Sequence, residues 1–394
     1  MESPARFPFP PRPDGGPPVE FGHRHRTAPL GEVVLPTGDR ATMAVRYDDV
    51  RGVLSDPRFS RDLRFPGAPR LTEPPDVTVD DDSVLINMDP PEHTRLRRIV
   101  ARSFSRRNAR QWRALAERTA TGLLDRMPAA GGTADLMADY AFPLSLEVIC
   151  AVLGVPEADR GWLRAGPDTF LPSVLMPGER RRIMLKVLEA FADKLIADRP
   201  GGLIGLLAEA HENGQLRAAE LTTMVSSLIT VGYESTAATL GRGVFALLRH
   251  PNQYRALCAD PGLLAGAVEE VLRYGFPTDG SALRVATEDV PLASGLVRKG
   301  TCVLPNVYAA NHDPARFDRP ERFDITRPSG PHLAFGYGIH RCLGAHLARM
   351  ELEVGLAVLV DRLPGLALAV PPEQVEWTTG MLSRRVATLP VVLA

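Results

Sequence analysis

The sequence predicts a mainly α-helical fold with small β-sheets. Apolar residues recur at helical spacing through most of the stretch 92–275, which is the first observation behind this prediction. The second is the segment 219–249, about thirty residues without a proline, which is long enough for one central helix. The third is that strand-like runs are short and occur mainly before residue 46 and after residue 282. We therefore expect a helical core with small sheets beside it.

The individual elements follow from local patterns. Residues 32–36 and 41–45 predict a hairpin around Thr37-Gly38-Asp39, and 47–54 predicts a short helix with an acidic first turn. Residues 62–84 contain many prolines and no clear period, which indicates a long loop. Helices are then predicted at 92–104, 107–127, 138–153, 158–165, 180–197, 202–212, 218–249, 251–258 and 262–275. Strands are predicted at 283–286, 290–294, 302–305, 365–370 and 387–393.

Composition and charge restrict the possible functions. A hydrophobic content of 44% and a charged content of 24% are typical of a globular protein. The formal net charge of −1 argues against nucleic acid as the main partner. The chain begins without an apolar signal-peptide region and contains no run of about twenty apolar residues, so we expect a cytoplasmic protein with no membrane partner. Residues 1–20, rich in proline and glycine, predict a flexible arm, and 21–394 a single domain.

Cys342 lies in a glycine-rich loop, Phe-Gly-Tyr-Gly-Ile-His-Arg-Cys-Leu-Gly over 335–344, which precedes a predicted helix at 343–359. Glycines let the backbone adopt positive φ angles and approach a flat, bulky group closely. The free amides and dipole of a helix N-terminus favour a thiolate, and a thiolate is a good axial ligand for haem iron.

Other roles for Cys342 fit the sequence less well. A single cysteine is more often a small buried core residue, which is the main alternative. A zinc site would need closely spaced ligands, but the other cysteines, Cys150, Cys258 and Cys302, are far away in the sequence. His340 and His346 are near, but neither belongs to a known nucleophile signature.

The run 335–344 resembles the haem-binding signature of the cytochrome P450 superfamily, with Phe335, the spacing glycines, Cys342 and the closing Gly344 in place. The resemblance extends from about residue 30 to the C-terminus. It implies the P450 fold, with a long central distal helix over haem, and haem b (iron protoporphyrin IX) as the cofactor. It also implies Cys342 as the metal ligand and Phe335 as the residue that packs beside the sulfur and tunes the iron.

The segment Val231-Gly232-Tyr233-Glu234-Ser235-Thr236 places a glycine, an acid and two hydroxyls inside the predicted long helix. Taken alone, these residues are more often a solvent-facing polar patch. They resemble the distal motif of the family, which implies that Gly232 makes room for oxygen and that Glu234 and Ser235 relay protons. The departures are Ser235, where the family usually has threonine, and Val231, where alanine or glycine is common.

Glu270 and Arg273 are three residues apart on one predicted helical face. Such a pair is usually a solvated surface bridge worth less than about 1 kcal/mol. It resembles the buried Glu-x-x-Arg pair of the family, and Arg322, in Pro320-Glu321-Arg322-Phe323, matches its third member. The resemblance implies a structural role in supporting the cysteine loop.

Four further residues match the family's contacts to the haem propionates. His93 and Arg97 are one turn apart on a predicted helix that follows Asp89-Pro90-Pro91, and the alternative is an ordinary basic surface helix. Arg284, in a predicted strand, and His340, two residues before the cysteine, complete the set implied by the resemblance.

The resemblance also indicates where a substrate would bind. By position, the candidates are mainly apolar and come from several segments, although such side chains can equally belong to the core. They are Val84, Leu85, Phe170, Tyr233, Leu283, Met381 and Leu382.

Together these features predict a haem-thiolate monooxygenase that hydroxylates or epoxidises a medium or large natural product in bacterial specialised metabolism. No flavin or iron–sulfur module is present in the chain, so we expect a separate ferredoxin or flavodoxin-like electron donor with its NAD(P)H reductase. One alternative is oxidative coupling or cyclisation without oxygen insertion, which Ser235 permits. Another is a non-catalytic haem-binding protein, although such a protein has no need for the Glu234-Ser235 relay.

Overall fold

The computed structural model describes residues 4–10, 12, 15–71, 84–128, 131–164, 178–275, 283–328, 330–378 and 385–393. The chain divides into two compact units. Unit 1 comprises Met1–Thr94, Leu272–Phe323 and Ser329–Cys342. Unit 2 comprises Arg95–Val271, Asp324–Pro328 and Leu343–Ala394. Within the described residues, no helix combines the length and the apolar character needed to cross a membrane.

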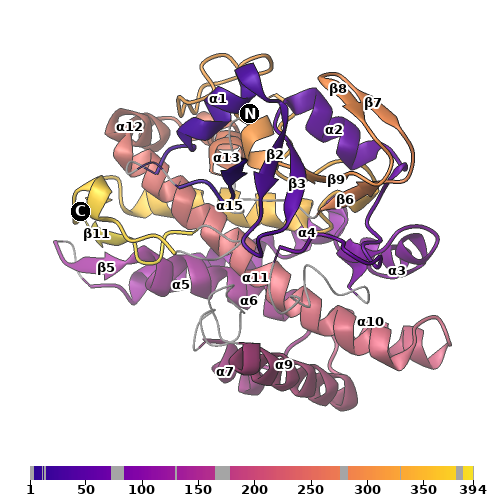
Figure 1. The fold of residues 1–394 in the computed structure, drawn as a ribbon. Coiled ribbons are helices and arrows are strands. Elements are labelled where there is room, and N and C mark those ends of the chain that lie inside the picture. Colours follow the sequence, from indigo (N-terminus) through magenta and orange to yellow (C-terminus); the bar gives the residue numbers. More distant parts are fainter. Residues whose placement is uncertain are drawn as a thin grey trace. The chain divides into compact units, whose positions relative to one another are not determined.

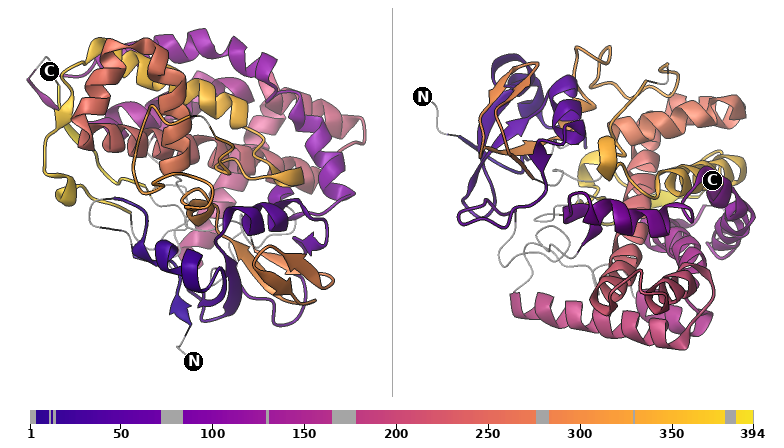
Figure 2. Two further views of the ribbon diagram at one scale, coloured as in Figure 1. Left: turned by 90° about the horizontal axis from the view of Figure 1, so that it is seen from above. Right: turned by 90° about the vertical axis from the view of Figure 1, so that its right-hand side faces the viewer.

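Unit 1 is built on a six-stranded sheet with the strand order β1-β2-β3-β9-β6-β4. Segments from the two ends of unit 1, indigo and orange in Figure 2, share this sheet. β2 pairs antiparallel with β3, β3 parallel with β9, and β9 antiparallel with β6. The strands are β1 (Ala5–Arg6), β2 (Leu30–Val34), β3 (Arg40–Ala44), β4 (Phe59–Ser60), β6 (Arg284–Ala286) and β9 (Cys302–Pro305).

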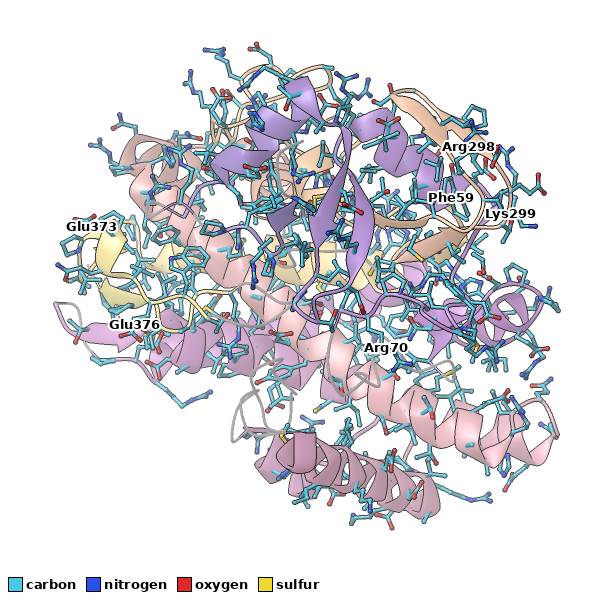
Figure 3. The ribbon with its side chains drawn as sticks, viewed as in Figure 1. Phe59, Arg70, Arg298, Lys299, Glu373 and Glu376 are labelled. Atoms are coloured by element: carbon cyan, nitrogen blue, oxygen red, sulfur yellow. The ribbon has the colours of Figure 1, made fainter. Side chains whose placement is uncertain are left out.

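Helices and one further hairpin surround this sheet in unit 1. Val50 and Val53 of α2, Phe59 of β4 (Figure 3) and Leu333 share one buried cluster of apolar side chains. Arg298 and Lys299 extend outward beyond the hairpin β7–β8. The elements are α1 (Val19–Thr27), α2 (Tyr47–Ser55), the 3₁₀ turns η1 (Leu85–Asn87) and η5 (Gly338–His340), α14 (Val307–Ala310), β7 (Val290–Leu292) and β8 (Gly295–Val297).

Unit 2 is helical and is organised around α11 (Ala218–Arg249), the longest helix in Figure 1, which packs alongside α6 (Phe142–Leu153). Glycines allow the close approach of its neighbours: a Cβ at Gly355 of α15 (Ala345–Arg362) would lie 3.1 Å from Leu240 Cδ2. The remaining helices are α4 (Arg106–Gln111), α5 (Arg113–Asp125), η2 (Met137–Ala141), η3 (Glu157–Asp159), α7 (Arg160–Arg164), α9 (Gly178–Asp198), α10 (Gly202–Glu212), α12 (Pro251–Ala259), η4 (Pro261–Leu263) and η6 (Pro372–Gln374).

A small antiparallel sheet completes unit 2, with the order β10 (Ala367–Leu368), β11 (Pro390–Val392) and β5 (Thr133–Asp135). Two helices contain boundaries between the units: α3 (Glu92–Ala101) and α13 (Leu264–Tyr274). The predicted long helix and the short strands at 284–286 and 302–305 are therefore present, and the secondary structure is mainly helical with small sheets.

Three features differ from the sequence-based expectation. The helix predicted at 107–127 is two helices, α4 and α5, because the N–H of Trp112 bonds to the carbonyl of Ala109, three residues back, and tightens the turn between them. The helix after the cysteine begins at Ala345 rather than at 343. Part of the predicted arm belongs to unit 1: β1 pairs with β2, Phe7 and Phe9 are buried, and α1 begins at Val19.

Candidate active site

The loop that carries Cys342 is fixed by its backbone. The Cys342 N–H donates to the carbonyl of Phe335 at 2.7 Å, and Gly336 and Gly338 have positive φ angles of 67° and 72°. A Cβ at Gly338 would collide with the backbone carbonyl of Leu54 at the end of α2, so only glycine fits there. Cys342 itself is exposed. The loop therefore presents a cysteine on a rigid, closely packed backbone, as a metal ligand requires.

Three of the predicted propionate contacts lie in unit 1 with that loop. His93, at the start of α3, is 2% exposed, and its ring centroid lies 4.3 Å from that of His340 in η5. Arg284 on β6 is 4% exposed, and its Nε has no hydrogen-bond partner within the described part of the chain. Arg97 is half-buried one turn after His93 on α3, but it belongs to unit 2, and its contact with a propionate stays a prediction.

The electrostatics of Arg284 test whether this site fits haem. Desolvation lowers the pKa of Arg284 to about 10, although Asp89 acts in the opposite direction. A buried cation with an unsatisfied donor is unfavourable unless an anion approaches it. A haem propionate is such an anion. The chemistry of Arg284, together with the exposed thiol of Cys342, therefore fits a thiolate-ligated haem.

Arg61 is a residue of this region that sequence reasoning missed. It is 2% exposed, its Nε donates to the carbonyl of Ile86 at 3.0 Å, and its terminal nitrogens contact Asn87 Oδ1 and the carbonyl of Leu283. Its guanidinium thereby joins η1 to the residue before Arg284. No local motif marks Arg61, because its partners are two backbone carbonyls and an amide from distant segments.

The predicted structural pair lies on α13, one turn apart. Glu270 accepts from the N–H of Asp324 at 2.9 Å and pairs with Arg327 Nε at 3.2 Å, a partner that the sequence did not indicate. Arg273 donates to the carbonyls of Asn311 and Pro320, both at 2.9 Å, and to the carbonyl of Arg322 at 3.1 Å. Arg322 therefore contributes a backbone acceptor, and a role for its exposed side chain stays a prediction.

The distal motif lies in the middle of α11. Ser235 donates its hydroxyl to the carbonyl of Val231 at 3.0 Å, one turn earlier, and the Val231 side chain is 57% exposed. Gly232 packs closely against α6, because a Cβ at this position would lie only 2.7 Å from Ile149 Cδ1. Helix packing is thus one reason for this glycine, and its role in accommodating oxygen stays a prediction.

The Glu234 carboxylate has a buried cationic neighbour. Arg385 Nε lies 3.6 Å from Glu234 Oε1, with side-chain exposures of 2% and 15%. Arg385 and the next residue, Val386, pair with Thr378 and Trp377 in unit 2. No motif in the sequence indicates that Arg385 reaches α11.

The predicted substrate residues fall into three groups. Val84 and Leu283 are buried in unit 1, and Leu85 is half-buried beside them in sequence on η1. Tyr233 is 1% exposed and packs its ring 5.6 Å from that of Phe142, so it is accounted for as a core residue between α11 and α6. Phe170, Met381 and Leu382 lie outside the described residues.

Comparison with known proteins decides the family. A family model for cytochrome P450 matches residues 262–379. Nocardicin C N-oxygenase from Nocardia uniformis subsp. tsuyamanensis is 41% identical over 370 residues, which are 92% of each chain. The chain belongs to the cytochrome P450 family. Another relative of this P450 is the mycinamicin IV hydroxylase/epoxidase of Micromonospora griseorubida, 39% identical over 94% of both chains.

Solved structures agree with this assignment. The structure of SgvP, a proposed thioether synthase in the tailoring of griseoviridin, has a TM-score of 0.92 and 38% identity, and the alignment covers 99% of this chain and 100% of SgvP. The predicted P450 fold is confirmed. The protein is a bacterial P450 monooxygenase with a haem-iron cofactor, and it acts on small molecules with electrons from redox partners.

Proposed function

We propose that this P450 hydroxylates or epoxidises a medium or large natural product in bacterial specialised metabolism. The observation that carries the proposal is the near full-length similarity to enzymes named for nocardicin C and mycinamicin IV. The apolar side chains of Val84, Leu85 and Leu283 in unit 1 are consistent with a largely apolar substrate.

The cofactor we propose is haem b, with Cys342 as the axial ligand and the propionates at His93, Arg97, Arg284 and His340. When bound, a thiolate-ligated haem activates O₂ for insertion into a substrate. Two observations support this assignment: the backbone hydrogen bond that fixes the cysteine loop, and the buried Arg284, whose Nε has no hydrogen-bond partner among the described residues. Phe335 would pack beside the thiolate and restrict its solvation, and Gly344 would end the loop before α15.

Proton delivery is proposed for Glu234 and Ser235. A proton relay needs a group that takes up and releases protons, and a hydroxyl that can both accept and donate. The Ser235 hydroxyl currently donates to the Val231 carbonyl, so its oxygen keeps lone pairs that can accept a proton from a neighbour. Rotation about χ1 would then direct its own proton elsewhere. Glu234, only 15% exposed, would supply the proton to this hydroxyl directly or through water.

The electron donor we propose is a ferredoxin or a flavodoxin-like protein, reduced by an NAD(P)H-dependent reductase, and the compartment is the cytoplasm. Exposed arginines after α3 would favour an acidic donor by electrostatic steering. They are Arg106, Arg107 and Arg110.

Oxidative coupling is the second candidate function. The similarity to SgvP, a proposed thioether synthase, supports it, as does Ser235 in the motif. A coupling enzyme would give a cross-linked or cyclised product that contains no oxygen atom from ¹⁸O₂, whereas a monooxygenase would incorporate one.

The first test is the difference spectrum of the reduced protein with and without CO. Thiolate ligation predicts the strongly red-shifted Soret band, and Cys342→Ser should abolish it while the matched Cys258→Ser retains it. An unchanged band in Cys342→Ser would refute the ligand assignment. Candidate natural products can then be screened by the spin-state shift of the Soret band, and Glu234→Ala should lower the product formed per NADPH.

A further inference from the structure

We propose that Arg385 is a positioning residue for the Glu234 carboxylate, which it holds on α11 by an ion pair that is largely screened from solvent. The inference rests on the proposed role of Glu234 in proton delivery, and it extends that role to a residue near the C-terminus. Arg385 Nε and Glu234 Oε1 are 3.6 Å apart, and the two side chains are 2% and 15% exposed.

Burial makes this pair more significant than a surface ion pair. An arginine side chain stays protonated in proteins, so a guanidinium that is 2% exposed requires an anion or several acceptors nearby. Glu234 supplies the anion. The 3.6 Å between Arg385 Nε and Glu234 Oε1 is longer than the roughly 2.7–2.9 Å of a charge-assisted hydrogen bond. We therefore infer that this nitrogen acts on the Glu234 carboxylate through its charge.

Arg385 is itself fixed independently of this pair. The backbone N–H of Arg385 donates to Thr378 Oγ1 at 3.2 Å, and the backbone N–H of Thr378 donates to the carbonyl of Arg385 at 2.9 Å. Trp377 forms a bridge with Val386, and its ring lies 5.4 Å from that of Phe245 on α11. The backbone that carries Arg385 is thus attached to the same helix as Glu234.

Two residues of α6 contact the neighbourhood of this ion pair. The Arg385 guanidinium lies 5.2 Å from the centre of the Phe142 ring. The Phe142 ring also contacts the Tyr233 ring, with centroids 5.6 Å apart and planes tilted by 50°. Ser145 of α6 donates to the carbonyl of Tyr233 at 2.9 Å and holds the backbone just before Glu234. Among the described residues, the charged groups here are Glu234 and Arg242 from α11 and Arg385 from the C-terminal segment. The contacts from α6 are the uncharged Phe142 and Ser145, and the titratable Glu351 of α15 lies beside Ser145.

This arrangement predicts a specific effect on protonation. A cation beside a carboxylate favours its ionised form, and removing the cation from a poorly solvated site makes the carboxylate bind its proton at higher pH. In Arg385→Gln, protonation of Glu234 should therefore move to higher pH by about one unit, the lower end of what a neighbouring charge produces. Arg385→Lys, which keeps a cation at this place, should recover most of that shift.

The control is Arg242→Gln. Arg242 is 4% exposed and its guanidinium lies 5.1 Å from the centre of the Trp377 ring, so its replacement disturbs the packing of the same C-terminal segment on α11. No ion pair between Arg242 and Glu234 is found among the described residues. A general loosening of the segment would therefore affect both variants, whereas a specific effect on Glu234 would appear only with Arg385→Gln.

The experiment is a pH titration of the haem-loaded protein by difference infrared spectroscopy, with Glu234→Gln used to assign the carboxyl band. A shift in Arg385→Gln, its recovery in Arg385→Lys and its absence in Arg242→Gln support the inference. Equal titration of Glu234 in the wild type and Arg385→Gln overturns it, as does an equal shift in Arg242→Gln.

A second readout separates this inference from the proposed relay. With a reconstituted electron donor, the peroxide released per NADPH should rise in Arg385→Gln and its pH dependence should follow the infrared titration. If the infrared band moves but peroxide release does not change, Arg385 still positions Glu234, and the role of Glu234 in proton delivery is refuted instead.

Discussion

The imidazole rings of His93 and His340 lie against each other in unit 1, with centroids 4.3 Å apart and planes tilted by 54°. One ring comes from the start of α3 and the other from η5, just before Cys342. Both residues match the family's contacts to the haem propionates. Because they were identified from separate motifs, their meeting in space supports a shared role.

We expect His93→Ala and His340→Ala each to bind haem less tightly. Each substitution removes a proposed donor to a propionate and also the ring contact with the other histidine. Transfer of haem to excess apomyoglobin should be severalfold faster in either variant, and the double variant should lose less than the product of the two effects, because residues in contact are not additive. His23→Ala, which alters an exposed histidine on α1, is the control and should transfer haem at the wild-type rate.

Arg284 should contribute more to haem retention than an exposed arginine in the same unit. Its guanidinium is 4% exposed, and burial lowers its pKa to about 10, so it is held where only an anion can compensate its charge. Arg284→Met should accelerate haem transfer by roughly tenfold, since a hydrogen bond to a charged group contributes about 1.5–3 kcal/mol.

The matched control for Arg284 is Arg298→Met, at an arginine that is exposed beyond β8 and pairs with Asp289 (Figure 3). Its haem transfer should equal that of the wild type. Equal rates in Arg284→Met and the wild type would remove Arg284 from the propionate site.

Local sequence patterns were sufficient for the parts of the molecule that a short segment determines by itself. Gly336 and Gly338 signalled a loop with positive φ angles, and the proline-free stretch at 219–249 corresponds closely to α11. Motif resemblance then selected His93, Arg284 and His340, all of which belong to unit 1. The ring of His93 contacts that of His340 in the cysteine loop, and Arg284 lies on the sheet of unit 1.

Contacts made through backbone carbonyls or between distant segments were not predictable in this way. Arg61 binds the carbonyls of Ile86 and Leu283, which any residue type could provide. The pairing of Arg385 with Glu234 depends on how the C-terminal segment folds back onto α11, and periodicity within one segment carries no information about that. The packing of Tyr233 against Phe142 of α6 is another such contact, and the expected contact of Tyr233 with a substrate stays a prediction.

Glu220 provides a test of stability in unit 2. It is 4% exposed at the start of α11 and accepts from Arg95 at 2.5 Å and Arg217 at 2.6 Å. Burial alone would raise the pKa of Glu220, but the hydrogen bonds from Arg217 and Arg95 outweigh it and lower that pKa to about 2. A depressed folded-state pKa means that the stabilisation is complete above the ordinary value of 4.5 and is lost as the pH falls towards 2.

Glu220→Gln should therefore lower the free energy of unfolding in urea at neutral pH by about 1–2 kcal/mol. This is less than the roughly 1.5–3 kcal/mol of a buried hydrogen bond to a charged group, because the side chains of Arg95 and Arg217 are 39% and 79% exposed. Its stability should also depend less on pH between 4.5 and 2 than that of the wild type. The comparison variant is Glu117→Gln, which breaks an exposed pair with Arg113 and should change the free energy by less than about 0.5 kcal/mol. Equal effects would show that burial adds nothing to the Glu220 cluster.

Glu351 presents the opposite situation in the core of unit 2. It lies on α15, is 1% exposed, and neither carboxylate oxygen has a hydrogen-bond partner within the described residues. Burial raises the pKa of Glu351 well above its ordinary value of 4.5, although the neighbouring Ser145 hydroxyl, which donates to the Tyr233 carbonyl, acts in the opposite direction. The folded protein therefore keeps a proton that the unfolded chain releases above about pH 4.5, and the free energy of unfolding must fall as the pH rises from there.

Replacement of Glu351 by glutamine should remove this pH dependence, because the amide has nearly the same shape and stays neutral. For a single group the slope in the wild type is at most about 1.4 kcal/mol per pH unit. Urea unfolding between pH 5 and pH 8, monitored by tryptophan fluorescence, should show a shallower decline for Glu351→Gln and a higher stability than the wild type at the alkaline end. Glu353→Gln, two residues along α15 at a side chain that is 41% exposed, should keep the wild-type slope. A slope in Glu351→Gln as steep as that of the wild type would mean that Glu351 is ionised in the folded protein, with a cation or water that compensates its charge.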